Sequence, residues 1–393
     1  MFMLIYTRVD QPVGTGFSTG TPTATTQEET AEDFVKFFKN FEKLFGIKNY
    51  KIYVTGESYA GRYVPYISAA MLDQNDTEYF NLSGALAYDP CIGNFVYSAE
   101  EAVVVPFVVE NNNILNLNAS FLSQMEDLHQ SCGYADYVDK YLQFPPPSIQ
   151  PTQFFNYSAN ASCDVFDMID NALLGVNPCF DIYEIVETCP LLWDVLAFPT
   201  QLVYSPAGAP MTYFNRTDVK TAIHAPQDVS WSECANNPVF VGGSGGPEME
   251  GDLSADPIQH VLPQVIEATN RVLIGNGDWD MIIITNGKSI TLSTLRAQAE
   301  MIGTLLSIQN MTWNGKLGFQ EQPNTPINIT MTDLIYAETF ALNGAATLDL
   351  AQGIMGVQHY ERGLMFVETY QSGHVSCHCR FHQTKVQNTD TRR

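Results

Sequence analysis

The stretch Gly56–Arg62 constrains the fold more than any other part of this chain. The preceding residues 51–54, Lys-Ile-Tyr-Val, form a short β-branched and aromatic run that is typical of a buried strand. The apolar spacing of residues 63–72 indicates a helix. A serine between a strand end and a helix start, closely preceded by glycine, has the pattern of a nucleophile elbow. The sequence therefore predicts that Ser58 projects from a tight turn at the edge of a sheet, where the helix N-terminus favours developing negative charge.

The segments around this turn alternate between strand and helix patterns. A helix is expected over residues 26–45, where phenylalanines repeat on one face, threonine and acidic residues crowd the start, and Gly46 follows the end. The resulting alternation of strand and helix predicts a parallel sheet. Further elements are predicted as a strand at 1–6, a turn at 10–18, strands at 84–88 and 271–276, helices at 258–268 and 290–308, and an antiparallel strand pair at 353–360 and 364–370.

The region from about residue 98 to about residue 256 differs in composition from the rest. Prolines, asparagines and five cysteines interrupt its short apolar patches. We interpret it as a Cys-rich cap insertion that covers the active-site face and shapes a substrate pocket. Six of the 8 cysteines lie between Cys91 and Cys234. Disulfides are expected in this region, although the sequence leaves their pairing open.

Charge and glycosylation motifs limit the partners of the chain. Lys+Arg 19 against Asp+Glu 43 gives a formal charge of −24, which makes nucleic acid and anionic membranes poor partners. No apolar run approaches the length of a bilayer span. A dense set of Asn-x-Ser/Thr motifs predicts N-linked glycans and a secretory route. These motifs begin at Asn75, Asn81, Asn118, Asn156, Asn160, Asn215, Asn310 and Asn328.

A serine nucleophile needs a base, and the base needs a carboxylate that orients it. In the α/β-hydrolase arrangement these residues follow in the order Ser, Asp, His, each on a loop that leaves the C-terminal end of a strand. Asp278 and Asp280 come just after the 271–276 strand, and His374 comes just after the 364–370 strand. The order and the placement of these residues both fit the arrangement. We interpret the remaining candidate bases as surface or structural histidines, namely His129, His224, His260 and His359.

These residues give the chain a resemblance to the fungal serine carboxypeptidases, a family with the α/β-hydrolase fold that removes C-terminal residues from peptides. The resemblance runs through nearly the whole chain up to His374, and Gly56–Tyr63 is its most specific element. The other matching stretches are Asp10–Ser18, Asn177–Cys179, Val219–His224, Gly277–Asp280 and Gly373–His374. The expected architecture is one α/β-hydrolase domain over residues 1–393, with a mostly parallel central sheet flanked by helices.

The resemblance implies a role for each residue of the site. Ser58 would be the nucleophile, His374 the general base and acid, and Asp280, the second aspartate of Gly-Asp-x-Asp, the residue that orients the histidine. The backbone N–H of Tyr59 would donate to the oxyanion, and Glu57 would help to bind the terminal carboxylate of the substrate. A carboxyl group that faces a carboxylate needs a shared proton, which raises its pKa, so we expect tighter peptide binding at acidic pH. The family implies an extracellular or vacuolar location, and neither a metal nor another cofactor is expected.

The start of the chain departs from the family pattern. The family's Asn-Gly-Gly-Pro-Gly-Cys-Ser-Ser segment would precede Asp10, and this chain begins too late to contain it. In the family this segment supplies a second oxyanion donor, groups that bind the substrate carboxylate, and a cysteine whose partner would correspond to Cys234. The strand before it lies between the first strand present here and the nucleophile strand, so we expect hydrogen bonds to be missing at the sheet centre.

Residues 375–393 form an atypical tail, because the family continues after Gly-His with a methionine, a proline-containing sequence and a final helix. A metal site is one interpretation of Cys377, His378, Cys379 and His382, but they have no standard zinc spacing. Our hypothesis is that a retained intron encodes this tail.

The leading prediction is a serine-type carboxypeptidase that releases C-terminal residues from peptides or proteins through an acyl-enzyme. One alternative keeps the fold and changes the chemistry, since relatives in this family act as acyltransferases. Another is a truncated fragment that retains the triad residues but is catalytically impaired. Substrate assays distinguish the first two, and labelling of Ser58 by a fluorophosphonate distinguishes an enzyme from a fragment.

Overall fold

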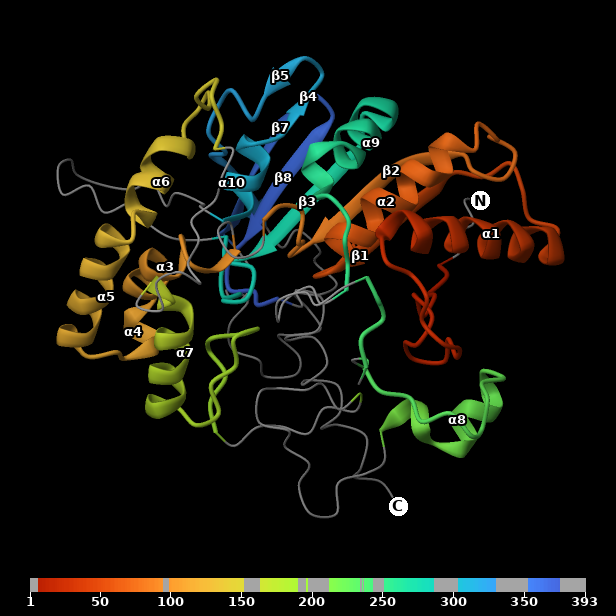
Figure 1. The fold of residues 1–393 in the computed structure, drawn as a ribbon, viewed down its shortest axis with the longest axis horizontal. Coiled ribbons are helices and arrows are strands. Elements are labelled where there is room, and N and C mark those ends of the chain that lie inside the picture. The colour runs from red at the N-terminus through yellow and green to blue at the C-terminus, as the bar shows by residue number, and fades with distance from the viewer. Residues whose placement is uncertain are drawn as a thin grey trace, which may run out of the picture.

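The structure is a computed structural model that describes residues 6–94, 99–151, 163–189, 196, 212–233, 235, 237–242, 251–285, 303–329 and 353–374. A six-stranded sheet in the order β1-β2-β3-β8-β7-β6 forms its centre (Figure 1). The strands are β1 Ile52–Glu57, β2 Leu82–Tyr88, β3 Val272–Gly277, β6 Thr325–Ile329, β7 Gly353–Glu361 and β8 Leu364–Thr369. The pairs β1–β2, β2–β3 and β3–β8 are parallel, whereas β7 pairs antiparallel with β8 and with β6. β1 lies at one end of this sheet and, among the described strands, pairs with β2 alone.

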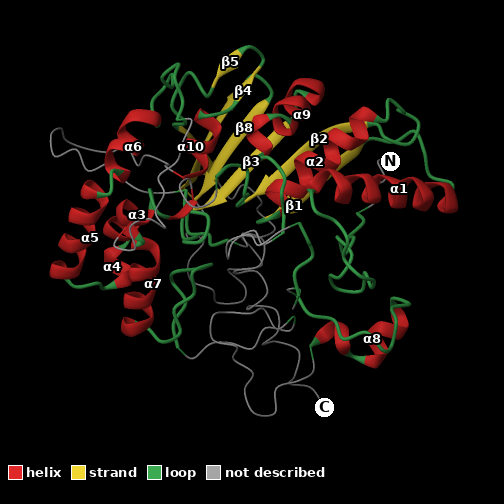
Figure 2. Ribbon diagram, in the orientation of Figure 1, coloured by secondary structure: helices red, strands yellow, loops and turns green. Residues whose placement is uncertain are grey.

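Helices flank the sheet, as Figure 2 shows. α2 (Ala60–Asp73) contacts β1, β2 and α9 (Val261–Thr269), and α1 (Gln27–Phe45) packs on α2. α10 (Gly303–Gln309) adds Leu305 and Ile308 to the core formed by these helices and the sheet. Two short antiparallel strands, β4 (Thr312–Trp313) and β5 (Lys316–Leu317), make a separate ribbon. The mostly parallel sheet with flanking helices confirms the predicted α/β-hydrolase class.

Local signals explain why α1 forms where the sequence predicted it. The side chain of Thr26 caps the helix by accepting a hydrogen bond from the backbone N–H of Glu29. Gly46 ends it with φ 65°, and its N–H donates to the Glu42 carbonyl.

The helix predicted at 258–268 is instead divided into a short 3₁₀ turn, Pro257–Gln259, and α9. Pro263 accounts for the break, because it has no N–H to offer the carbonyl of Gln259 four residues earlier.

The chain between β2 and β3 carries six described helices, which are α3 Val104–Glu110, α4 Asn112–Leu115, α5 Ala119–Ser131, α6 Tyr134–Tyr141, α7 Val165–Val176 and α8 Thr217–Ala222. α3 to α7 gather on one side of the molecule and α8 lies on the other (Figure 1). Two disulfides, Cys132–Cys163 and Cys179–Cys189, link parts of this region. They agree with the predicted Cys-rich insertion, whereas its limits near 98 and 256 and its role as a cap remain predictions.

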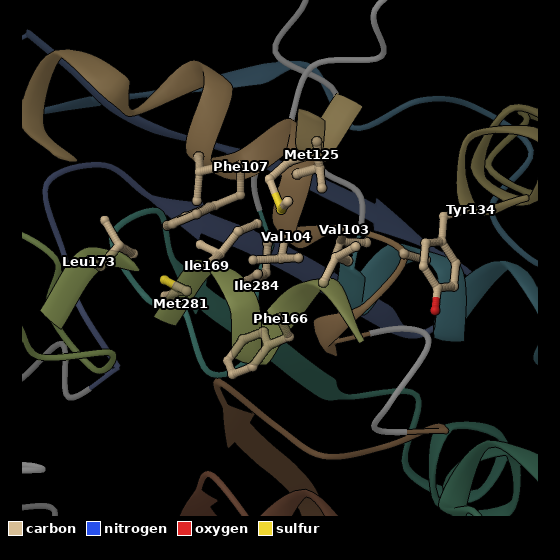
Figure 3. Packing of buried hydrophobic residues seen from close by; sticks show 14 of the residues in the cluster. Val103, Val104, Phe107, Met125, Tyr134, Phe166, Ile169, Leu173, Met281 and Ile284 are labelled. Carbon is tan, nitrogen blue, oxygen red and sulfur yellow. The ribbon is translucent and has the colours of Figure 1, made fainter. Parts of the chain in front are cut away.

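The helices α3 to α7 share a hydrophobic core that reaches the loop after β3. Val104, Phe107 and Ile169 are fully buried there, and Figure 3 shows them packed around Met281 and Ile284. Both of these residues have 0% exposure, and they lie one and four positions after Asp280 in the chain. Burial of such side chains contributes roughly 1.5–3 kcal/mol each. The insertion therefore fixes the backbone just beyond the predicted orienting aspartate.

Several predictions fall outside the described residues. They include residues 1–5 of the expected first strand, residues 290–302 of the expected helix, Cys234 and the tail 375–393.

The predicted turn at 10–18 is confirmed, since Asp10 Oδ2 accepts from the N–H of Phe17 at 2.8 Å and Gly14 N–H donates to the Ser18 carbonyl at 2.7 Å. In the part of the chain that the structure describes, no helix is long and apolar enough to cross a membrane.

Candidate active site

The turn between β1 and α2 has the strained backbone of a nucleophile elbow. Ser58 adopts φ 60°, a left-handed conformation that is uncommon for residues other than glycine. Its N–H donates to the Tyr88 carbonyl at 2.9 Å, and its carbonyl accepts from Gly61 at 2.8 Å and from Cys91 at 3.2 Å. These bonds hold the serine between the ends of β1 and β2 and the first turn of α2. The sequence prediction of an elbow at Ser58 is confirmed as backbone geometry.

The nucleophile-elbow pattern Gly-x-Ser-x-Gly would place its last glycine at position 60, where this chain has Ala60 followed by Gly61. Close packing explains the difference. A Cβ atom on Gly56 would lie 2.4 Å from the Cβ of Ala60, so the methyl group uses the space that Gly56 leaves. A Cβ atom on Gly61 would lie 2.5 Å from the backbone nitrogen of Cys91. The glycine is therefore required at 61, where the helix passes close to the loop that follows β2.

The predicted base and its carboxylate meet in a buried hydrogen bond. His374 Nδ1 lies 2.7 Å from Asp280 Oδ2, and the two residues are 3% and 0% exposed. The other oxygen of Asp280 accepts from the N–H groups of Ile282 and Ile283 at 2.8 and 3.2 Å. The backbone of His374 is held as well, because its N–H donates to the Tyr183 carbonyl at 2.7 Å. The imidazole is thus fixed with Nε2 as its available nitrogen.

The loops that carry Asp280 and His374 are bonded directly to each other. Asp278 Oδ1 accepts from the N–H of Ser372 at 3.2 Å, and the N–H of Trp279 donates to the Ser372 carbonyl at 2.9 Å. A Cβ atom on Gly277 would lie 2.3 Å from that same carbonyl oxygen, so glycine is needed where the loops touch. Asp278 is therefore well placed for the structural role expected of it, although the role of each aspartate is still a prediction.

The third contact of the predicted triad is not a hydrogen bond in this structure. Nε2 of His374 is buried without a hydrogen-bond partner in the described residues, so it does not bond the hydroxyl of Ser58 here. Catalytic hydrogen bonds are often long in the absence of substrate and shorten in the bound complex. The structure thus brings Asp280 and His374 together, while the link from His374 to Ser58 remains a prediction.

Electrostatics set the charge state of the imidazole. Burial opposes its protonation, whereas the negative charge of Asp280 and the hydrogen bond between the two residues favour it. With added contributions from Glu57 and Asp181, the pKa of His374 lies above its ordinary value. Asp280 is therefore placed to stabilise the imidazolium that forms when His374 accepts a proton.

A second buried carboxyl group, Asp89, was missed in the sequence. It follows β2 directly, is 0% exposed, and accepts through Oδ1 from the N–H of Gly277 at 2.8 Å. Burial and then the charges of Asp280 and Glu57 raise its pKa well above the ordinary range, which favours its protonated form. An aspartate between a strand and Pro90 has the pattern of a turn residue, so the sequence offered no signal for this position.

Asp89, Asp280 and His374 each offer a potential metal-ligand atom, and these atoms lie within 4.8 Å of one another. Nδ1 of the histidine and both oxygens of Asp280 are already engaged in the hydrogen bonds described above. A metal ion could be bound by these atoms only if their hydrogen bonds were broken. The donor set therefore fits proton transfer better than metal binding.

The residue after the nucleophile has a backbone donor available. The N–H of Tyr59 makes no hydrogen bond within the described part of the chain, as is usual at a helix N-terminus.

Glu57, the residue before the nucleophile, is the last residue of β1. Burial raises the pKa of Glu57, while the positive charge of His374 acts in the opposite direction. The N–H of Tyr59 is therefore available to an oxyanion, and the raised pKa of Glu57 agrees with a shared proton; both roles stay predictions.

A cleft of about 820 Å³ lies away from these residues, beside the turn at Asp10. Its walls include Phe34, Phe37 and Phe41 of α1 together with Trp231. Neither Ser58 nor His374 lines it, so the cleft is separate from the candidate active site.

Comparison with known proteins decides the family. The family model described as serine carboxypeptidase matches residues 2–385. The chain belongs to the serine carboxypeptidase family. Similar members are serine-type carboxypeptidase F of Aspergillus niger, which is 64% identical over 93% of this chain and 65% of its own length, and a probable serine carboxypeptidase of Arthroderma benhamiae, which is 40% identical over 93% of this chain and 62% of its own length.

A solved structure supports the fold of this serine carboxypeptidase family member. The crystal structure of Kex1, a prohormone-processing carboxypeptidase from Saccharomyces cerevisiae, superposes with a TM-score of 0.57 at 21% identity. The match covers 93% of this chain and 69% of the Kex1 chain. The present chain spans 65% and 62% of the length of the two fungal relatives above. The resemblance to the family is therefore confirmed, while the activity of the whole protein is a matter for proposal.

Near the active site, β8 contains a buried carboxyl group that pairs with no described side chain. Glu368 is 0% exposed, and neither of its carboxylate oxygens has a hydrogen-bond partner in the described residues. Burial, followed by the charges of Asp278 and Glu110, raises its pKa well above the ordinary range. Burial likewise raises the pKa of Asp278 to about 7. Such a cluster favours the folded state at acidic pH, where its members are neutral.

The variant Glu368→Gln should lose part of the pH dependence of folding. Above its unfolded pKa, Glu368 is ionised in the unfolded chain and protonated in the folded chain, so the free energy of unfolding falls by about 1.4 kcal/mol per pH unit. The amide does not titrate, so the stability of the variant relative to the original chain should rise from pH ~4.5 towards neutrality. Urea unfolding across this range measures the difference. Exposed Glu321→Gln is the control, and a stability difference that does not change with pH would contradict the assignment.

Proposed function

We propose that this chain provides the active site of a serine-type carboxypeptidase that releases C-terminal residues from peptides or proteins through an acyl-enzyme. The observation that carries the proposal is the buried Asp280–His374 pair, bonded at 2.7 Å at the same edge of the sheet as the Ser58 elbow. Nucleophilic acyl transfer requires a carboxylate that holds an imidazole within reach of a serine, and the buried Asp280–His374 pair supports the first part of this arrangement. Membership of the serine carboxypeptidase family supports the same reaction.

In the proposed reaction, Ser58 Oγ attacks the carbonyl carbon of the last peptide bond while His374 Nε2 takes the hydroxyl proton. Asp280 stabilises the imidazolium, and the N–H of Tyr59 donates to the oxyanion. The C–N bond then breaks, and His374 gives its proton to the leaving amine. A water molecule repeats the sequence on the acyl-enzyme, with its proton going to His374 and then to Ser58. The products are the released amino acid and the shortened peptide.

Glu57 is proposed to make peptide binding tighter at acidic pH. Burial raises the pKa of this carboxyl group, so it stays protonated into a higher pH range than an exposed glutamate. A protonated Glu57 can donate a hydrogen bond to the terminal carboxylate of a peptide, whereas an ionised one repels it. Binding is therefore expected to weaken as pH rises through the pKa of Glu57.

Proposed partners and location follow from the family and from the surface. Exposed acceptors for N-linked glycans are present at Asn75, Asn118 and Asn328, which supports a secreted or vacuolar glycoprotein. Asn215 is an exception, because its side chain bonds both the N–H and the carbonyl of Trp231 at 2.7 Å. The charge of −24 supports peptide rather than nucleic-acid substrates.

The proposed activity is tested with an N-blocked dipeptide and its C-terminal amide. The chain should release the last amino acid from the free acid at acidic pH and should cleave the amide more slowly, because the amide lacks the carboxylate that Glu57 would bind. Chromatographic quantitation of the free amino acid released from the acid, and of the amino acid amide released from the amide, measures the two rates. Absence of release from the free acid, with a correctly folded chain, would refute the proposal. Equal rates on both substrates would refute the role of Glu57 alone.

A further inference from the structure

Tyr59 is tied to a distant part of the chain through its side chain. Its hydroxyl donates to Asp252 Oδ2 at 2.6 Å, across 193 positions of sequence. α2 gives this residue no side-chain cap hydrogen bond, so the helix itself does not set the direction of the phenol ring. The ring also contacts Tyr63 and Phe240, with centroid distances of 5.2 and 6.4 Å.

Asp252 is fully engaged by hydrogen-bond donors. Gln27 Nε2 donates to Oδ2 at 2.8 Å, and the N–H and hydroxyl of Ser254 donate to Oδ1 at 3.0 and 2.6 Å. Burial acts to raise the pKa of Asp252, but the hydrogen bonds from Ser254, Tyr59 and Gln27 outweigh it and hold the pKa below its ordinary value. The acceptor of the Tyr59 hydroxyl is therefore a carboxylate, which gives a stronger bond than a neutral acceptor.

The segment that carries Asp252, residues 251–256, is itself anchored on two helices. The N–H of Leu253 donates to the Thr25 carbonyl at 2.9 Å, next to the start of α1. On α2, Arg62 bonds Asp256 at 2.6 Å, and the Tyr66 hydroxyl donates to the Ala255 carbonyl at 2.8 Å. Arg62 is 1% exposed, so this ion pair is shielded from solvent on the arginine side. The segment that contains Asp252 is thus held by both helices, next to the nucleophile turn.

We propose that Asp252 is a positioning residue for acyl transfer, holding Tyr59 so that its backbone N–H points at the developing oxyanion. This inference rests on the proposed function, because it needs Ser58 to be the nucleophile. An oxyanion donor works only when it is already aimed at the place where charge develops. The phenol–carboxylate bond removes the rotation that would let the peptide unit between Ser58 and Tyr59 turn away.

The variants Tyr59→Phe and Asp252→Asn test the role, with Tyr66→Phe as the matched control. Tyr66 lies two turns further along α2 and bonds the same anchored segment. Both test variants should lower kcat on the blocked dipeptide by about tenfold with KM within about twofold, less than the 10²–10³-fold loss for removing an oxyanion donor outright. Tyr66→Phe should lose similar thermal stability and keep its kcat, which a merely structural role of Asp252 would not predict.

The outcomes separate this inference from the proposed function. Turnover by the original chain together with an unchanged kcat in Tyr59→Phe would overturn the inference alone. An equal fall of kcat in Tyr66→Phe would also overturn it, because the effect would then follow stability. If Asp252→Asn does not fold, the comparison of the two tyrosine variants decides. No turnover by the original chain would overturn the proposed function and this inference with it.

Discussion

Replacing Ser58 by alanine is expected to lower kcat on a blocked dipeptide by about 10⁶-fold, the scale on which loss of a catalytic serine removes covalent catalysis. The effect is large because no acyl-enzyme can form without this hydroxyl, so the proton transfers of His374 have no covalent intermediate to act on. Binding of the substrate should change little, since the carboxylate contact with Glu57 does not involve the serine. Steady-state kinetics with enough enzyme to detect slow turnover measures the loss.

Ser68→Ala is a suitable control for this experiment. Ser68 lies in α2, the helix that follows Ser58, is 0% exposed, and its hydroxyl makes no hydrogen bond in the described residues. Removing that hydroxyl should leave both kcat and stability nearly unchanged. If Ser58→Ala kept more than a hundredth of the original activity, another residue would have to be the nucleophile.

The variant Asp280→Asn is expected to lower kcat by about 10⁴-fold while the chain remains folded. The amide oxygen can still accept from the N–H groups of Ile282 and Ile283, but the amide NH₂ then faces Nδ1 of His374. The imidazole responds by placing its proton on Nε2, so it cannot accept the proton of Ser58. Kinetics of the variant at the pH optimum, with circular dichroism to verify folding, measures the effect.

The neighbouring aspartate of the same Gly-Asp-Trp-Asp stretch gives a matched control. The pKa of Asp278 is raised to about 7, so below this pH its side chain is neutral and asparagine resembles it closely. Asp278→Asn should keep activity within about tenfold at acidic pH, because the bond to the N–H of Ser372 survives. A larger loss in Asp278→Asn than in Asp280→Asn would reverse the assignment of the two aspartates.

Much of the fold could be predicted because its signals are local. The capped helix α1, the alternating strands and the elbow at Ser58 each depend on residues that are close in sequence. The pairing of Asp280 with His374 could also be anticipated, since the ends of neighbouring parallel strands converge at one edge of the sheet. The break before α9 was missed, although Pro263 contained the necessary information.

Other features depend on burial, which the residue types alone do not reveal. Asp89 and Glu368 are charged residue types that usually lie at the surface, and only the three-dimensional structure shows that both are fully buried. The bond from Tyr59 to Asp252 joins segments 193 positions apart, and no periodicity in the sequence relates them. The sequence also left the disulfide pairing open, because no pattern in it relates one cysteine to its partner. The structure shows the pairs Cys132–Cys163 and Cys179–Cys189.

The central claim is that Ser58 is a nucleophile activated by His374, and covalent labelling tests it most directly. The folded chain is treated with a fluorophosphonate, and the modified peptide is identified by mass spectrometry, with His374→Ala treated in parallel. The account predicts a single adduct on Ser58 that forms rapidly in the original chain, is slowed by a blocked dipeptide and is lost in the variant. An adduct on a different serine, or equally fast labelling of Ser58 without the imidazole, would contradict it.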